Sequence, residues 1–144
     1  MAAGGRVEGF DVTPDGKTVW AANAQDGTIT AIDVASKTVA TFSANVQGAN
    51  RLKFTPDGTQ ALVSTLGAAD LRLIRVSDRS EVKRIPVGTG AAGIEIQPNG
   101  ARAYVACSPD NYVAVVDLKS MQVVGRIDAG KNPDGLAWAA IPQR

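Results

Sequence analysis

The sequence predicts an all-β fold of consecutive four-stranded antiparallel meanders, and an internal repeat is the first observation behind this prediction. The stretch GIEIQPNG at 93–100 recurs as GFDVTPDG at 9–16 and as RLKFTPDG at 51–58, so the copies start 42 residues apart. A fourth start, GLAWA, follows at Gly135, although Ala140 replaces the turn proline there. Short runs of alternating apolar residues are the second observation, and the Pro-Asp-Gly and Pro-Asn-Gly turns are the third.

Alternation with period two is typical of half-buried strands, and no segment shows helical periodicity with caps. The first strands of the repeats are expected near 7–13, 49–55, 91–97 and 135–140. The second strands are expected near 17–23, 59–65 and 101–107, the third near 28–34, 70–76 and 112–118, and the fourth near 38–43, 80–87 and 122–128.

A single meander cannot bury both of its faces, so it must stack on neighbours of its own kind. The radial solution is a β-propeller, whose four-stranded blades surround a channel. Blade one is predicted at 7–48, blade two at 49–90 and blade three at 91–132, followed by an extra strand at 135–140. Three blades cannot close a ring, so we expect a partial propeller or half of an oligomeric one. A solenoid stack is the alternative.

Composition limits the function classes. The 144 residues suit one domain, and 15 basic against 14 acidic residues give a net charge of +1, which does not favour nucleic acid or an anionic membrane surface. No stretch approaches the ~20 apolar residues of a membrane helix. The chain has no histidine, and Cys107 is its one cysteine. We therefore expect no cofactor, no metal, no nucleic-acid partner and no membrane insertion.

The two ends of the sequence suggest a piece of a longer protein. The start MAAGG leads directly into a first strand and lacks the apolar run of a signal peptide, whereas AIPQR after the fourth start is typical of a natural C-terminus. We therefore expect a C-terminal fragment of a larger propeller.

The repeats also carry a four-residue signature, which reads WAAN at 20–23, LVST at 62–65 and YVAC at 104–107. With the Pro-Asp-Gly turns and the Ile-Asp or Val-Asp pairs that end two of the third strands, this signature resembles the YVTN-type propeller repeats of bacterial and archaeal surface and secreted proteins. The resemblance spans almost the whole chain. It implies a propeller fold and a periplasmic, extracellular or cell-surface parent protein, but it specifies little about function.

Blade two departs from its neighbours toward positive charge. Arg75 replaces an aspartate, Arg51 replaces a glycine and Lys53 replaces an acidic residue at the corresponding repeat positions. The blades carry 2 basic and 5 acidic, 7 and 4, and 4 and 4 residues, which gives balances of −3, +3 and 0. One interpretation is that opposite charges favour the stacking of adjacent blades.

The other interpretation is a ligand site, because propellers commonly bind ligands at the channel mouth. Three charged residues are expected on the innermost strands near the channel, and three further residues at its mouth or on the rim loops. The candidate ligand-binding residues are Asp11, Lys53 and Glu95 on the strands and Arg51, Asn132 and Asp134 at the mouth and rim. No catalytic residue is predicted.

Other local patterns have simpler explanations. GTGAAG at 88–93 fits the dinucleotide template G-x-G-x-x-G, but a strand follows it, so a blade linker is the better interpretation. Cys107 has no histidine to activate it and is expected to pack as a buried or edge thiol. Asp26 and Asp110 are expected to serve turn chemistry. The aromatic residues Trp20, Tyr104 and Trp138 are expected in the core.

Three functions remain open. The first is a non-enzymatic propeller module that binds a protein or a ligand. The second is part of a lactonase-like hydrolase whose catalytic groups lie in other blades. The third is part of a periplasmic, quinoprotein-like redox propeller. Because both end blades would expose apolar faces, we also expect self-association, for example as a homodimer that completes six blades.

Overall fold

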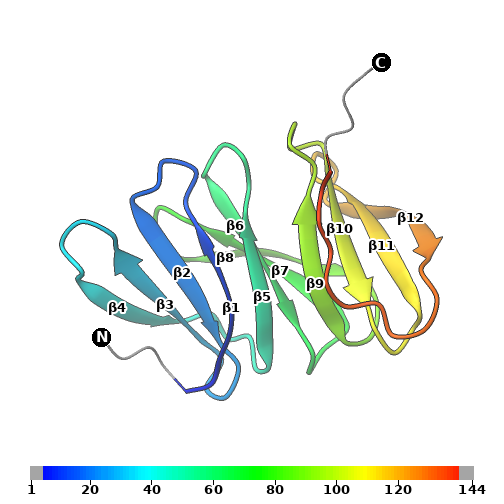
Figure 1. The fold of residues 1–144 in the computed structure, drawn as a ribbon, viewed down its shortest axis with the longest axis horizontal. Helices are drawn as coiled ribbons and strands as arrows, with labels where there is room; N and C mark the ends of the chain where they lie inside the picture. The colour runs from blue at the N-terminus through cyan, green and yellow to red at the C-terminus, as the bar shows by residue number, and fades with distance from the viewer. Residues whose placement is uncertain (1–4, 140–144) are drawn as a thin grey trace.

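The computed structural model describes residues 5–139, which form three four-stranded antiparallel sheets placed side by side (Figure 1). Blade 1 contains β1 (Val7–Val12), β2 (Thr18–Asn23), β3 (Thr28–Asp33) and β4 (Val39–Ser43). Blade 2 contains β5 (Ala49–Phe54), β6 (Gln60–Thr65), β7 (Asp70–Arg75) and β8 (Glu81–Pro86). Blade 3 contains β9 (Ala91–Ile96), β10 (Arg102–Cys107), β11 (Tyr112–Asp117) and β12 (Gln122–Asp128).

The three meanders confirm the predicted fold class. Within each sheet the strands follow chain order, and the first strands of successive blades touch, with β5 in contact with both β1 and β9. The blades therefore fan out from a row of innermost strands (Figure 1). Among the described residues, no helix is long and apolar enough to cross a membrane.

The turns repeat as regularly as the strands. The predicted glycines after β1, β5 and β9 adopt the left-handed conformation that glycine tolerates best. These are Gly16 (φ 74°), Gly58 (φ 69°) and Gly100 (φ 70°). In the first of these turns, Thr13 Oγ1 donates a hydrogen bond of 2.7 Å to Asp15 Oδ1, and the corresponding bond in blade 2 joins Thr55 to Asp57.

The turn from third to fourth strand explains one departure of blade 2. In blade 1, Asp33 Oδ1 accepts a hydrogen bond from the Ser36 N–H at 2.7 Å. Blade 2 has Arg75 in place of that aspartate, and Asp78 takes over by accepting from the Ser80 N–H at 3.1 Å. The guanidinium of Arg75 lies 2.9 Å from Asp78. Hydrogen bonds from Ser80, and then from Arg75, lower the pKa of Asp78 to about 2.

The first core fills the space between blades 1 and 2. Trp20 is 2% exposed, and its ring makes edge contacts with Phe42 and Phe54 at centroid distances of 5.0 and 5.1 Å. Ile29 and Val63 pack into the same cluster. Such aromatic pairs contribute about 0.5–1.5 kcal/mol beyond the area they bury. Trp20 is thus a core residue, as predicted.

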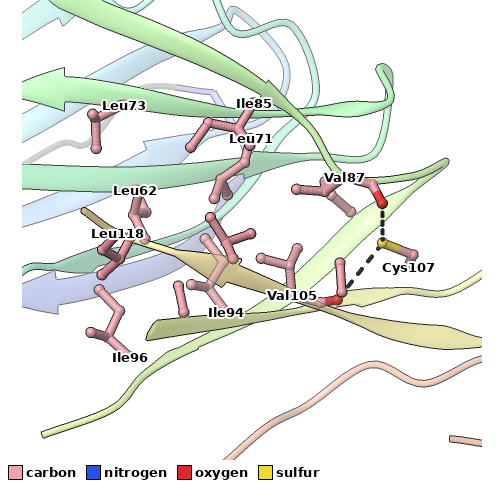
Figure 2. Packing of buried hydrophobic residues seen from close by; sticks show 14 residues of the cluster. Leu62, Leu71, Leu73, Ile85, Val87, Ile94, Ile96, Val105, Cys107 and Leu118 are labelled. Carbon is pink, nitrogen blue, oxygen red and sulfur yellow. Dashed lines mark hydrogen bonds between the residues drawn. The ribbon is translucent and has the colours of Figure 1, made fainter. Parts of the chain in front are cut away.

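The second core lies between blades 2 and 3 (Figure 2). Leu62, Leu71 and Ile85 from blade 2 meet Val105 and Cys107 from blade 3. The Cys107 side chain is fully buried, and its Sγ lies 3.7 Å from the carbonyl oxygens of Val87 and Val105. Burial raises the pKa of the Cys107 thiol. The prediction of a packed thiol is confirmed.

The extra strand expected at 135–140 is not formed in the described residues. Residues 133–139 run alongside β9 without strand pairing, and residue 140 lies outside the described range (Figure 1). In the 42-residue repeat, residues 133–139 correspond to the innermost strand of a fourth blade. In blades 1 to 3 that strand pairs with a second strand, and no described strand offers such an edge here.

The linker before this segment nevertheless keeps the repeat geometry. Each blade begins after a left-handed residue whose carbonyl accepts a hydrogen bond from the end of the second strand, as Arg6 does from the Ala24 N–H at 3.0 Å. The corresponding residues are Arg6 (φ 50°), Gly48 (φ 73°), Gly90 (φ 60°) and Asn132 (φ 51°). Residue 132 therefore starts a fourth unit in register. Trp138, predicted in the core, is instead 43% exposed, since no strand in residues 5–139 covers it.

Candidate functional site

The innermost strands bring three of the predicted site residues into a row. Because β5 lies beside β1 and β9, residues 42 apart become neighbours across blades. Lys53 Nζ lies 3.8 Å from Glu95 Oε2, and the carboxylate of Asp11 accepts a hydrogen bond of 3.0 Å from the Phe54 N–H. Each of the three side chains therefore contacts an adjacent blade.

Arg51 adds a second contact between blades 1 and 2. Its Nη1 donates to the main-chain oxygens of Glu8 at 3.2 Å and Asn50 at 3.3 Å, and lies 3.9 Å from the Glu8 carboxylate. The pairs of Arg51 with Glu8 and of Lys53 with Glu95 are partly exposed, so each contributes about 0–1 kcal/mol. These contacts favour the interpretation that opposite charges help adjacent blades to stack.

Arg51 stands where the other blades have a glycine, and the Ser64 hydroxyl makes the contact between strands at this junction. In blade 1, a Cβ atom on Gly9 would lie 2.7 Å from the main-chain oxygen of Asn50, so that position has no room for a side chain. At the next junction, Ser64 Oγ accepts a hydrogen bond from the Arg51 N–H at 3.1 Å and donates one to the Ala92 oxygen at 2.6 Å. The Ser64 hydroxyl thus links β5 to β9, whereas a glycine at residue 51 would let the two backbones approach directly.

The other two predicted residues lie apart from this row. The N–H of Asn132 donates to Asn111 Oδ1 at 3.0 Å on the linker that follows β12. Asp134 lies beyond β9, where its main-chain oxygen faces Gly93. The six predicted residues therefore do not surround one pocket.

A cavity of about 380 Å³ opens at the rim between blades 1 and 2. Its wall combines the start of β1 with the turns that follow β2 and β6, and Arg6, Glu8, Gln25 and Asn50 provide its charged and polar groups. Asn50 is only 5% exposed, and its Oδ1 atom has no hydrogen-bond partner among the described residues. No sequence pattern marks the side-chain carbonyl of Asn50 as unpaired, since that depends on contacts across the blade junction.

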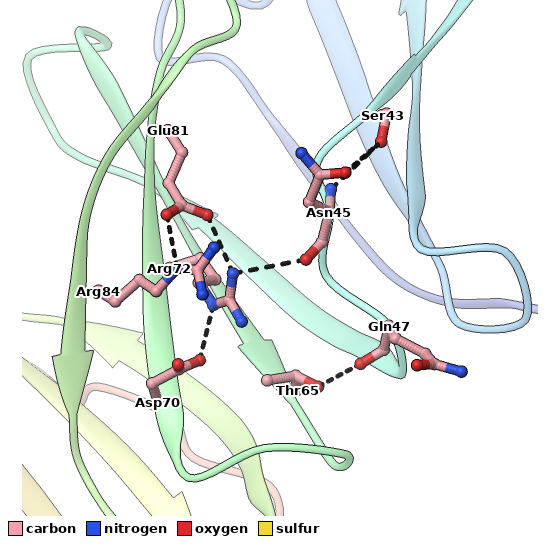
Figure 3. Close-up of polar contacts among 8 residues, drawn as sticks. All are labelled: Ser43, Asn45, Gln47, Thr65, Asp70, Arg72, Glu81 and Arg84. Atoms are coloured by element: carbon pink, nitrogen blue, oxygen red, sulfur yellow. Dashed lines mark hydrogen bonds and ion pairs between the residues drawn. The ribbon is translucent and has the colours of Figure 1, made fainter.

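Gly48, which lines this cavity, ends the linker 44–48, and blade 2 holds this linker (Figure 3). Arg72 is 7% exposed and donates to the Asn45 oxygen at 3.4 Å, while Thr65 Oγ1 donates to the Gln47 oxygen at 2.6 Å. Gly48, next along the linker, accepts a hydrogen bond of 3.1 Å from the Leu66 N–H. The Gly48 part of the cavity wall is therefore anchored to blade 2 by hydrogen bonds.

Arg72 is itself anchored by two carboxylates. Its Nε lies 2.7 Å from Asp70 Oδ1, and its Nη1 lies 3.0 Å from Glu81 Oε2. Burial alone would lower the pKa of Arg72, but the hydrogen bonds to Asp70 and Glu81 outweigh it, and the pKa is raised. Hydrogen bonds from Arg84 lower the pKa of Glu81, as do those from Arg72. Sequence reasoning missed Arg72, because its repeat position holds Thr30 in blade 1 and Ala114 in blade 3.

The loop aspartates serve the turns, as expected. Asp26 Oδ1 accepts from the Thr28 hydroxyl at 2.6 Å, and Asp110 Oδ2 accepts from the Thr89 N–H at 2.7 Å. Residues 88–90 form the linker into β9 and residues 91–93 begin that strand, so a strand and not a helix follows the linker. Within residues 5–139 no group of three or more His, Cys, Asp or Glu side chains is placed to hold a metal ion.

The fold defines the chain as part of a β-propeller, and comparison with solved structures agrees. Hydrazine synthase from Kuenenia stuttgartiensis, a propeller-containing protein, superposes with a TM-score of 0.83 at 28% sequence identity. The match covers 90% of this chain and 38% of that chain, so the present sequence spans well under half of its length. No protein-family model matches the sequence, and no curated protein matches it.

Proposed function

We propose that this chain is a non-enzymatic β-propeller module that binds a protein or a ligand as part of a larger ring of blades. The observation that carries the proposal concerns the face that each blade turns toward the preceding blade. This face is covered in blades 2 and 3 but exposed in blade 1. At equivalent repeat positions, Leu52 is 1% exposed and Ile94 is 3% exposed, whereas Phe10 is 69% exposed. Leu52 and Ile94 each pack against the preceding blade, which Phe10 lacks.

At the opposite end of the stack, the face that blade 3 would turn toward a following blade is also exposed. Ile85 of blade 2 is 1% exposed because blade 3 covers it, but the equivalent Ile127 of blade 3 is 49% exposed. Tyr104 and Trp138 meet there with ring centroids 6.1 Å apart, and they line an apolar hollow together with Ile127 and Leu136. Exposed apolar patches of this kind mark surfaces that normally contact another layer.

The occupant that we propose for both ends is a further blade of the same polypeptide. The match to only 38% of a longer propeller-containing chain supports this choice. Residues 135–139 support it too, because they already occupy the place beside β9 where β1 of a second copy would have to dock. The resemblance to YVTN-type repeats is consistent with a ring of this kind, in a periplasmic, extracellular or cell-surface parent.

Light scattering on the 144-residue chain over a range of concentrations tests this proposal. We expect weak association that rises with concentration through the uncovered apolar face of blade 1 and is weakened by Phe10→Asp. Val124→Asp is the matched control, because Val124 is also exposed, at 56%, but lies on the outermost strand of blade 3. A discrete, stable dimer would instead indicate that two copies close a six-bladed ring. A monomer that is insensitive to Phe10→Asp would contradict the open-interface argument.

A second candidate function is part of a propeller enzyme whose catalytic groups lie in other blades, either a hydrolase or a redox enzyme. The similarity to hydrazine synthase at 28% identity favours keeping this candidate. If this candidate is right, Asp11, Lys53 and Glu95 on the innermost strands are needed for turnover in the full-length protein. If the chain is a binding module, changes to these three residues alter stability or binding alone.

A further inference from the structure

We propose that Asn99, in the turn between β9 and β10, is a site of spontaneous deamidation that the folded turn holds in check. The side-chain amide of Asn99 is converted to a carboxyl group when this turn opens. The inference goes beyond the ring-forming module proposed above. It does not depend on ring completion, because the turn lies within blade 3.

The residue that follows Asn99 is the first argument. Asn99 is the one asparagine of the sequence that precedes a glycine, Gly100. Deamidation begins when the main-chain nitrogen of the next residue attacks the side-chain carbonyl carbon of asparagine. A glycine has no side chain and therefore hinders this attack least. Asn99 and the preceding Pro98 are exposed, so water and hydroxide reach the site.

The reaction needs no reagent other than water. The Gly100 nitrogen forms a bond to Cγ of Asn99, the bond from Cγ to the side-chain nitrogen breaks, and ammonia leaves with the former Gly100 amide proton. The product of this step is a five-membered cyclic imide. Water then opens the imide at either carbonyl carbon. Attack at Cγ gives aspartate, and attack at the main-chain carbon gives isoaspartate.

The folded turn engages both groups that take part in the first step. The Gly100 N–H donates a hydrogen bond of 2.7 Å to the Gln97 oxygen, which protects this proton from removal by hydroxide. Asn99 Oδ1 accepts a hydrogen bond of 3.0 Å from the Ala101 N–H, which fixes the side chain. The Gly100 nitrogen is therefore free to attack Cγ only when the turn opens locally.

The other two blades show that this turn accepts the aspartate product. Asp15 and Asp57 occupy the position of Asn99 in blades 1 and 2, and each accepts a hydrogen bond of 3.0 Å from the N–H two residues further on. Ala101 offers the same donor at residue 99, and such bonds are stronger when the acceptor is charged. Isoaspartate adds a carbon atom to the main chain and should disrupt the turn.

Deamidation also changes the charge at a blade junction. Asn99 and Asp57 line one hollow between blades 2 and 3, whereas Asp15 and Asp57 line the corresponding hollow between blades 1 and 2. Conversion of Asn99 therefore gives the second junction a pair of carboxylates like that of the first. It lowers the net charge of the chain from +1 to 0, since 15 basic residues then face 15 acidic ones.

Incubation of the 144-residue chain at pH 8, with and without guanidinium chloride, tests the proposal. Peptide mapping by mass spectrometry follows the exchange of the Asn99 amide for a carboxyl group. We expect conversion to be at least tenfold faster in denaturant than in buffer. Asn111 is the matched control, because it is also exposed in a turn but precedes Tyr112. It should convert at least tenfold more slowly than Asn99 in denaturant.

Three variants separate the effect of the turn from that of the local sequence. Pro98→Ala removes the ring that presets the backbone of the turn, so conversion in buffer should be at least threefold faster, with an unchanged rate in denaturant. Gly100→Ala should slow conversion in denaturant at least tenfold, because a side chain hinders the attack. Asn99→Asp reproduces the aspartate product and should melt at the same temperature as the wild type.

Four results would overturn the proposal. Equal rates in buffer and in denaturant, or an unchanged rate in buffer for Pro98→Ala, would show that the turn does not control the reaction. A lack of conversion in denaturant would show that Asn99 is not a deamidation site. Equal conversion of Asn111 in denaturant would show that Gly100 does not direct the reaction. None of these results bears on the blade contacts that the light-scattering experiment tests.

Discussion

The Cα atom of Gly93 in β9 lies directly against the main-chain carbonyl oxygen of Asp134, so closely that any Cβ atom at residue 93 would overlap that oxygen. The same relationship joins Gly9 to Asn50 one junction earlier. Residues 134–139 therefore lie against β9 much as β5 lies against β1. A position without a side chain is what allows this close approach of two backbones.

We expect Gly93→Ala to push residues 134–139 away from blade 3, because the contacted atom belongs to the backbone and not to a flexible side chain. Overpacking of this kind costs about 1–3 kcal/mol. The measurement is urea unfolding combined with the fluorescence of Trp138, whose emission should shift to longer wavelength. Gly135→Ala is the control and should have little effect, since nothing lies within 4 Å of a Cβ atom there. Identical behaviour of the two variants would contradict this packing.

Arg72→Ala should lower the free energy of unfolding by about 1–3 kcal/mol, since it removes the hydrogen bonds that a 7% exposed guanidinium makes to two partly buried carboxylates. It also releases the linker at Asn45. Arg84→Ala removes another arginine from Glu81, but this side chain is 54% exposed, so we expect a loss of less than about 1 kcal/mol. Chemical denaturation of both variants measures the difference, and equal losses would show that Arg72 does not anchor the linker.

Cys107 should resist thiol reagents in the folded protein. Its side chain has no exposed surface, and burial raises the pKa of the thiol, so little thiolate is present near neutral pH. Reaction with a disulfide reagent should be slow in buffer and complete within seconds in denaturant. Rapid labelling of the native protein at pH 8 would show that the junction of blades 2 and 3 opens readily.

Acid should destabilise the protein only below about pH 4. Hydrogen bonds from Ser80, and then from Arg75, lower the pKa of Asp78 from 3.8 to about 2. A pKa that is lower in the folded state contributes stability above the unfolded pKa, and this contribution is lost as the pH falls toward 2. The pKa values of five other turn aspartates are lowered in the same direction, those of Asp15, Asp26, Asp33, Asp57 and Asp117.

Urea unfolding at a series of pH values tests this expectation. The unfolding free energy should change little between pH 5 and 8, because the chain has no histidine. It should then fall between pH 4 and 2, less steeply in Asp78→Asn than in the wild type. A stability that stays constant down to pH 2 would contradict the assigned role of these turns.

Much of the fold could be predicted because its signals are local and occur three times. The turn glycines at 16, 58 and 100 and the alternating apolar residues recur every 42 residues, so each copy supports the others. The candidate site was less accessible to prediction. Asp11, Lys53 and Glu95 share a repeat position, which placed them in one row, but Asn132 and Asp134 were grouped with them only because they were expected on the same rim.

The sequence by itself determined the repeat length, the strands of all three blades and the turns, because these follow from dihedral preferences and side-chain alternation within a few residues. The tertiary structure decided which charges pair across blades, that Asn50 Oδ1 has no hydrogen-bond partner among the described residues, and that residues 135–139 run beside β9 without forming a strand. These features depend on groups tens of residues away and on whether a neighbouring strand is present. A local sequence pattern specifies neither the distant contacts of a residue nor the presence of a neighbouring strand.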